Sequence, residues 1–154
     1  MSSASIRTTI LWIHAVGGAA WVGAATVFVI AAGAIGLEDE EGLTMVRRIA
    51  PAINRVGLAA VLFIIVSGAV SLYIAGLMRG FAFSNNFIEL LSVKIAILLA
   101  MFVVLTRSWR AEPRLASSDP SQARGAARRL IIFNLAVMGL GAAALLLGLW
   151  LLGS

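Results

Sequence analysis

The sequence predicts an all-α integral membrane protein, folded as a four-transmembrane-helix antiparallel bundle. Four apolar runs carry most of the chain, at residues 10–37, 56–78, 87–106 and 130–152. Each has about 20 residues or more, the length that an α-helix needs to cross a hydrocarbon core of ~30 Å. Hydrophobic residues make up 61% of the chain and charged residues 12%, about half the charged fraction of an ordinary soluble domain. Residues 1–154 therefore form a single domain embedded in the lipid bilayer.

The basic residues predict how the four spans are oriented. Arg7 precedes the first span, and Arg79 lies between the second and the third. The other two connections carry nine arginines: Arg47, Arg48, Arg55, Arg107, Arg110, Arg114, Arg124, Arg128 and Arg129. Because basic residues gather in cytoplasmic loops, we expect an up-down-up-down topology in a bacterial cytoplasmic (inner) membrane, with both termini outside. The same rule accounts for the net charge of +5 without a nucleic-acid partner.

The two cytoplasmic connections differ in their expected structure. Residues 44–50 predict a helical approach to the second span, with Pro51 in the first turn of that span, where proline is tolerated. The arginines around it are expected to anchor the chain to anionic lipid. Residues 107–129 contain Pro113 and the polar run 117–121, which predict a turn-rich, mobile loop.

Polar side chains of three spans share one depth in the outer leaflet. At a rise of 1.5 Å per residue, His14 lies ~6 Å, Tyr73 ~7 Å and Lys94 ~10 Å from the outer end of its span. Glu89 lies just above them. An ionisable group inside a span marks a candidate site unless a partner or the interface explains it. The common depth therefore predicts one shared site.

The first span adds a pattern on one helical face. His14, Gly18 and Trp21 follow one another at i, i+4 and i+7, which places them on the same side of a helix. Gly18 leaves room for a flat ring against the helix, and Trp21 supplies an apolar wall below it. Imidazole binds haem iron, copper or zinc, so His14 is the candidate metal ligand. Haem b is favoured over copper, because the chain has one histidine, no cysteine and no methionine cluster.

The same residues also have structural explanations. His14 can bond a backbone carbonyl, and Gly18 can serve close packing of helices. Lys94 can extend to the interface along its own stem or pair with Glu89, rather than bind an anionic group such as a porphyrin propionate. Asn134 predicts an interhelical hydrogen bond. The sequence leaves open whether any cofactor is bound and whether the protein is an enzyme.

Residues 14–23 resemble the first span of the copper-resistance D (CopD) family, which carries an H-x6-W-x-G pattern. Here the pattern is His14, Trp21 and Gly23. Residues 89–94 and 110–115 look like the third span and the following loop of that family. The layout is also similar to HemJ-type protoporphyrinogen oxidases, whose first-span histidine and third-span lysine correspond to His14 and Lys94. The resemblance implies copper uptake or, on the second likeness, haem b binding with porphyrinogen oxidation.

A different class of function is also compatible with the sequence. The chain contains 15 glycines, and small residues let membrane helices approach closely, whether in one chain or between chains. The protein could therefore be an accessory or structural subunit of a larger membrane complex, or a homo-oligomer. The polar residues of the spans would then hold helices together.

Overall fold

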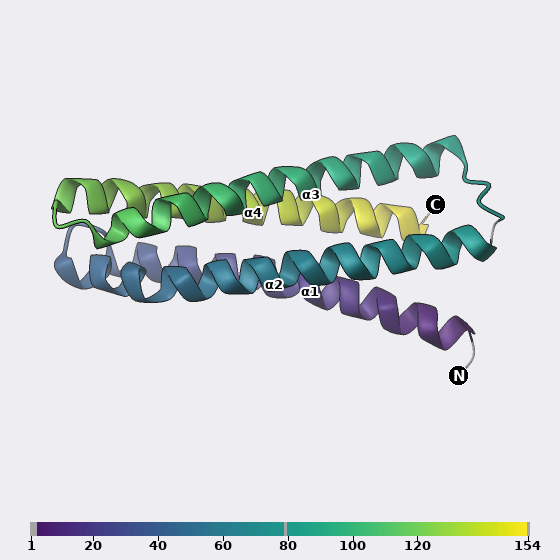
Figure 1. Ribbon diagram of the computed structural model, residues 1–154, viewed down its shortest axis with the longest axis horizontal. Coiled ribbons are helices and arrows are strands. Elements are labelled where there is room, and N and C mark those ends of the chain that lie inside the picture. Colours follow the sequence, from purple (N-terminus) through teal and green to yellow (C-terminus); the bar gives the residue numbers. More distant parts are fainter. Residues whose placement is uncertain (1–2, 79, 154) are drawn as a thin grey trace.

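The computed structural model describes residues 3–78 and 80–153, which form one antiparallel bundle of long helices (Figure 1). The elements are α1 (Ser3–Ile35), α2 (Glu40–Met78), α3 (Asn85–Ala111), the short 3-10 helix η1 (Glu112–Ala116) and α4 (Pro120–Gly153). Both chain ends and the α2–α3 connection lie at one end of the bundle, and the other two connections lie at the opposite end. All four α-helices are long and apolar enough to cross a membrane. The predicted four-span helical bundle is therefore confirmed.

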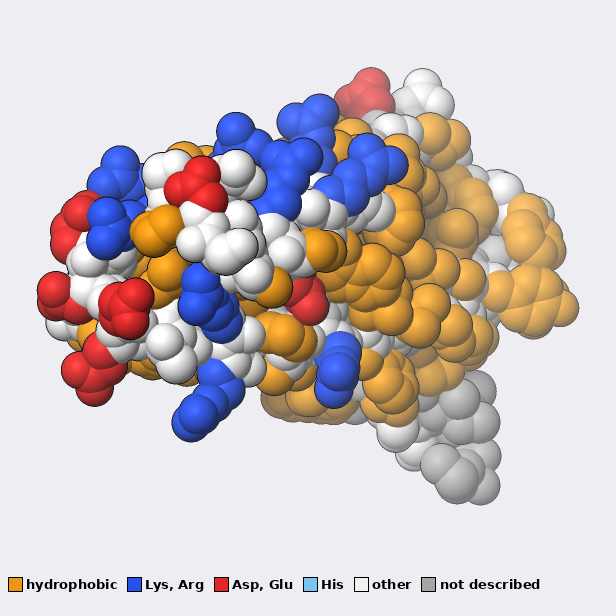
Figure 2. Space-filling model, turned by 60° about the vertical axis from the view of Figure 1, so that its left-hand side comes forward, with side chains coloured by type: hydrophobic (Ala, Val, Ile, Leu, Met, Phe, Trp, Pro, Cys, Tyr) orange, Lys and Arg blue, Asp and Glu red, His pale blue; other side chains and the backbone are white. Residues whose placement is uncertain are grey.

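The charged side chains gather at the end that holds the α1–α2 and α3–α4 connections. Figure 2 shows arginines and carboxylates mixed over that end, with an almost continuous hydrophobic surface beyond it. We call the half of the bundle near this end the inner half, and the half near the chain termini the outer half. A hydrophobic surface of this kind suits contact with lipid tails.

Packing is concentrated in the inner half and the middle of the bundle. Two clusters of buried hydrophobic residues lie there: Phe28, Ala32, Leu43, Val46, Ala50, Ala111, Leu115, Ala123, Ala126, Ala127 and Leu130, and then Trp21, Ala25, Ala60, Val61, Met101, Leu105 and Val137. Many of these residues are alanines, which let the helices approach closely.

The outer half has no comparable core. No described hydrophobic residue before Trp21, between Val61 and Met101, or after Val137 is buried. The α2 and α3 helices touch at few positions, and α1 and α3 have no backbone contact in the described part of the chain. Toward its N-terminus α1 also leans away from the other helices (Figure 1). The candidate site predicted from the sequence lies in this loosely packed half.

The connection between the third and fourth spans differs from the prediction of a mobile loop. Only residues 117–119 lie outside a helix, and Pro113 sits in the first turn of η1. The carboxylate of Asp119 caps α4, accepting hydrogen bonds from the hydroxyl (2.7 Å) and the N–H (2.8 Å) of Ser121. These bonds hold the pKa of Asp119 below its ordinary value. The loop prediction was wrong because it gave weight to polarity, whereas the buried alanines 123, 126 and 127 pack this segment into the inner cluster.

The start of α2 also departs from the prediction. Residues 44–50 are helical, as predicted, but the helix already begins at Glu40, so Pro51 lies inside it rather than in a first turn. Arg47, expected at the lipid surface, instead donates hydrogen bonds to the backbone oxygens of Leu115 at 2.5 Å and Ser117 at 3.4 Å. This arginine therefore ties α2 to the α3–α4 connection.

The orientation in the membrane stays a prediction and has a direct test. Because the chain has no cysteine, single cysteines can be introduced at Asn86, near the α2–α3 connection, and at Ser118, near the α3–α4 connection; both side chains are exposed. In intact cells an impermeant maleimide should label Asn86→Cys, and it should label Ser118→Cys only after permeabilisation. The reverse pattern would invert the topology.

Candidate functional site

Helix α2 holds the ring of His14. Nδ1 of the half-buried His14 lies 3.0 Å from Oγ of Ser67, one of the few buried polar side chains. The ring lies against Gly68 of α2, where a Cβ would be 3.4 Å from Cε1, an ordinary van der Waals contact. The imidazole therefore faces α2.

The hydrogen bonds of Ser67 favour one position for the proton of the His14 ring. A hydroxyl has one proton to donate, and that of Ser67 is directed at the backbone oxygen of Phe63 at 2.5 Å, with the oxygen of Ile64 at 3.3 Å. The oxygen of Ser67 is then the acceptor and Nδ1–H of His14 the donor. A neutral imidazole with its proton on Nδ1 keeps a free lone pair on Nε2. In this tautomer the hydrogen bond to Ser67 leaves Nε2 available.

Open space lies beside Gly18, one turn from His14. A Cβ at Gly18 would meet no atom of another element within 4 Å, whereas one at Gly17 would contact Ile64 and Phe63 of α2 at 3.6 Å. Trp21 lies deeper, is 2% exposed and belongs to the central cluster. The space beside Gly18 is thus free of side chains of the other helices, and Trp21 is packed one turn deeper.

Lys94 has no anionic partner in the described part of the chain. Its side chain is half-buried and reaches α4: a Cβ added to Gly148 would lie 3.8 Å from Nζ of Lys94. Glu89 is exposed and forms no ion pair with it: the one salt bridge between described residues joins Arg128 and Glu38 in the inner half.

Tyr73 does not lie with these residues. It is 60% exposed and shares its helical face with the exposed Val66, Val70 and Leu77, whereas Ser67 points into the bundle. Its predicted depth placed it near His14, but the sequence-based argument did not determine its direction around the helix. The outward direction of Tyr73 gives no support to its predicted place in the site, which stays a prediction.

The sequence analysis missed two serines of α2. Besides Ser67, Ser71 has a buried hydroxyl that makes no hydrogen bond with any described residue. The two serines are four residues apart and therefore lie on one side of the helix. This spacing was the signal available in the sequence. A buried hydroxyl without a partner is uncommon in folded proteins and calls for an explanation such as a ligand or a water molecule.

A second polar group lies in the inner half, where Asn54, Ser108, Glu112 and Asn134 come together. Ser108 donates to Oδ1 of Asn54 at 2.8 Å, and the amide of Asn54 donates to Glu112 at 2.5 Å. The amide of Asn134 donates to the backbone oxygen of Leu130 in its own helix at 2.8 Å. The predicted interhelical hydrogen bond of Asn134 is thus absent from the described residues.

A closed metal site within one chain receives no support. The described residues contain no group of three or more histidine, cysteine, aspartate or glutamate side chains that could hold an ion. Comparison of the chain with protein-family models, with curated proteins and with solved structures finds no match. The function is therefore argued from the arrangement of the site itself.

Proposed function

We propose that this small four-span membrane protein binds haem b in the outer half of its bundle, with Nε2 of His14 as the axial ligand. Haem needs one axial protein ligand and an apolar slot. A chain with a single histidine can supply that ligand. When bound, haem b would supply one-electron transfer; to oxidise a porphyrinogen it would have to pass the electrons, one at a time, to a separate electron acceptor.

The observation that carries this proposal is the hydrogen bond between His14 and Ser67. Histidines that bind a metal through one ring nitrogen usually donate the N–H of the other to a fixed acceptor. Ser67 is such an acceptor at 3.0 Å, and it is itself fixed by the backbone of its own helix. An interhelical hydrogen bond of this kind can also hold two membrane helices together, so the haem titrations below separate the two roles.

Three further features of the outer half fit a flat, anionic ligand. Gly18 borders open space, the hydroxyl of Ser71 has no partner among the described residues, and Lys94 has no carboxylate beside it. Lys94 would pair with a propionate, since a cation in a span is costly without an anion. Trp21 would close the inner end of the slot. The exposed Glu89 would reach at most the polar rim.

The test is to titrate haem into detergent-solubilised variants, one of which has a side chain that blocks the proposed slot. Gly18→Leu places a bulky side chain in the proposed ring position and should weaken haem binding at least tenfold. Gly33→Leu is the matched control, because the space beside Gly33 is equally open but lies in the inner half of the same helix. Equal haem affinity in both variants would contradict the proposed slot.

Removing the acceptor of His14 should weaken the site without destroying it. Ser67→Ala leaves Nδ1–H without its fixed partner, and loss of such a partner typically lowers metal affinity about 10–100-fold. Ser92→Ala is the control, since the Ser92 hydroxyl also bonds a backbone oxygen four residues earlier but is exposed. Haem titration of the two variants measures the difference. Equal affinities would remove Ser67 from the site.

A second candidate, an accessory subunit of a membrane complex, is favoured by the missing core of the outer half. A helix of a partner, rather than a cofactor, would then fill the space that the described residues leave unpacked. Extraction in mild detergent should in that case give a heavy particle that contains other polypeptides. Copper handling is less favoured, because a copper site would need His14 from a second copy of the chain.

A further inference from the structure

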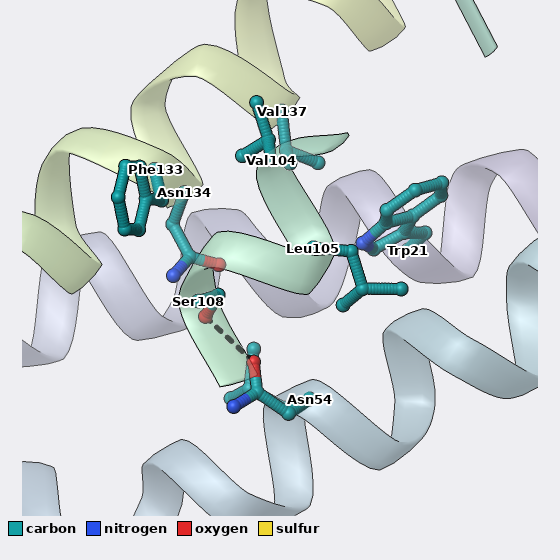
Figure 3. A pocket seen from close by; sticks show the side chains of 9 residues that line it. Trp21, Asn54, Val104, Leu105, Ser108, Phe133, Asn134 and Val137 are labelled. Atoms are coloured by element: carbon teal, nitrogen blue, oxygen red, sulfur yellow. Dashed lines mark hydrogen bonds between the residues drawn. The ribbon is translucent and has the colours of Figure 1, made fainter. Parts of the chain in front are cut away.

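Each of the four helices contributes one buried side chain with a polar atom to a small pocket in the inner half. Figure 3 shows Trp21 of α1, Asn54 of α2, Ser108 of α3 and Asn134 of α4 around this space. They are 2%, 4%, 4% and 7% exposed, respectively. Leu105, Val104, Val137 and Phe133 complete most of the lining, and the cavity measures about 10 Å³. Four helices that each bring a buried polar group to one point call for a common explanation.

Part of the hydrogen bonding in the pocket is complete. Ser108 donates its proton to Asn54, and Asn54 donates to Glu112. Both ends of the Asn54 amide are thus occupied. The oxygen of Ser108 has given its one proton and keeps the capacity to accept.

Two polar atoms of the pocket have no partner in the described part of the chain. Oδ1 of Asn134 receives no hydrogen bond, since only the amide nitrogen of this residue is engaged. The indole N–H of Trp21 likewise has no acceptor. In Figure 3 the indole nitrogen and the Asn134 oxygen lie on the sides of their residues that face the pocket. Inside a membrane such groups are expensive unless something pairs with them.

We propose that the pocket binds one ordered water molecule that joins the four helices. The water accepts the N–H of Trp21 and donates its two protons to Oδ1 of Asn134 and Oγ of Ser108. A cavity of about 10–15 Å³ is enough for one water, and a buried water needs two to four polar partners. A small cation fits less well, because the N–H of Trp21 directs a partial positive charge into the same space.

This water site is independent of haem binding and concerns the inner half alone. Through Asn54 it extends a continuous hydrogen-bonded chain from Glu112 near the inner end to Asn134 of α4. It adds a polar junction to helices of the inner half that otherwise pack through buried hydrophobic side chains and the hydrogen bonds of Arg47. Loss of the outer-half ligand would leave this junction in place.

The test uses the indole signals of the full chain in detergent micelles, labelled with 15N-tryptophan. Trp21→Phe identifies the Trp21 signal by its disappearance. In the unaltered chain the Trp21 N–H should show a cross-peak to a long-lived water, and Asn134→Leu should abolish it. Asn86→Leu, at an exposed position in the outer half, should leave it unchanged. The other three indole signals report whether each variant is folded, and Ser108→Ala serves as a milder second variant in which the cross-peak should weaken.

Three outcomes would overturn the proposal. The first is a Trp21 N–H without a water cross-peak in the unaltered chain. The second is a cross-peak that survives at full strength in folded Asn134→Leu or Ser108→Ala protein. The third is a Trp21 signal that shifts when sodium chloride replaces N-methylglucamine chloride, since that dependence identifies a bound cation in place of water.

Discussion

Substitution of His14 by alanine is expected to abolish the Soret band of the purified protein. His14 is the only histidine of the chain, so no other imidazole of the chain could replace Nε2 as the proposed axial ligand. The fold should survive, because the ring contributes one hydrogen bond to Ser67, and such a bond is worth about 1 kcal/mol net. Absorption spectra of the two proteins, prepared from haem-replete cells at equal concentration, measure the loss.

Added imidazole provides the control for this experiment. His14→Ala leaves a space that a free imidazole molecule can enter, and imidazole should restore part of the Soret absorbance. Restoration would show that the variant kept its slot and lost only its ligand. A His14→Ala protein with the full Soret band of the unaltered chain would remove His14 from haem binding.

Substitution of Trp21 by alanine is expected to produce the largest loss of stability. Trp21 is 2% exposed, and its indole contacts the glycine face of α2, where a Cβ at Gly57 would lie 3.0 Å from Nε1. Removal of a fully packed tryptophan destabilises by about 3–5 kcal/mol, because it loses contacts and leaves a cavity. Reversible unfolding in mixed micelles, followed by helical circular dichroism, measures the effect.

Trp12 in the same helix is the matched control. Its side chain is 67% exposed in the outer half, so Trp12→Ala should change the free energy of unfolding by less than about 1 kcal/mol. Comparable losses in the two variants would contradict the division into a packed inner half and an open outer half.

The fold could be predicted because its signal is local. Length and hydropathy identify each span independently, and the result does not depend on which side of a helix faces its neighbours. The helical structure of residues 120–129 could not be predicted in this way. It depends on small alanines that bury against distant residues such as Phe28 and Leu43, and polarity alone favoured a loop.

The site could be predicted in depth but not in direction. Counting residues from the ends of the spans predicted that His14, Tyr73 and Lys94 lie at the same depth in the membrane. The spans are apolar on nearly every face, however, so no amphipathic pattern indicates which face turns inward. Tyr73 accordingly proved exposed, and Asn134 proved to donate within its own helix. Ser67 could not be singled out, because a serine inside a span costs little free energy and gives a much weaker signal than a charged side chain.

The measurement that tests the central claim most directly is the haem and iron content of the unaltered protein, extracted in mild detergent from haem-replete cells. Haem binding through His14 predicts a Soret band, a pyridine haemochrome spectrum of haem b, and about one haem and one iron per chain. A colourless protein without iron would contradict the claim, and the chain would then be a four-helix membrane subunit whose outer half is filled by a partner.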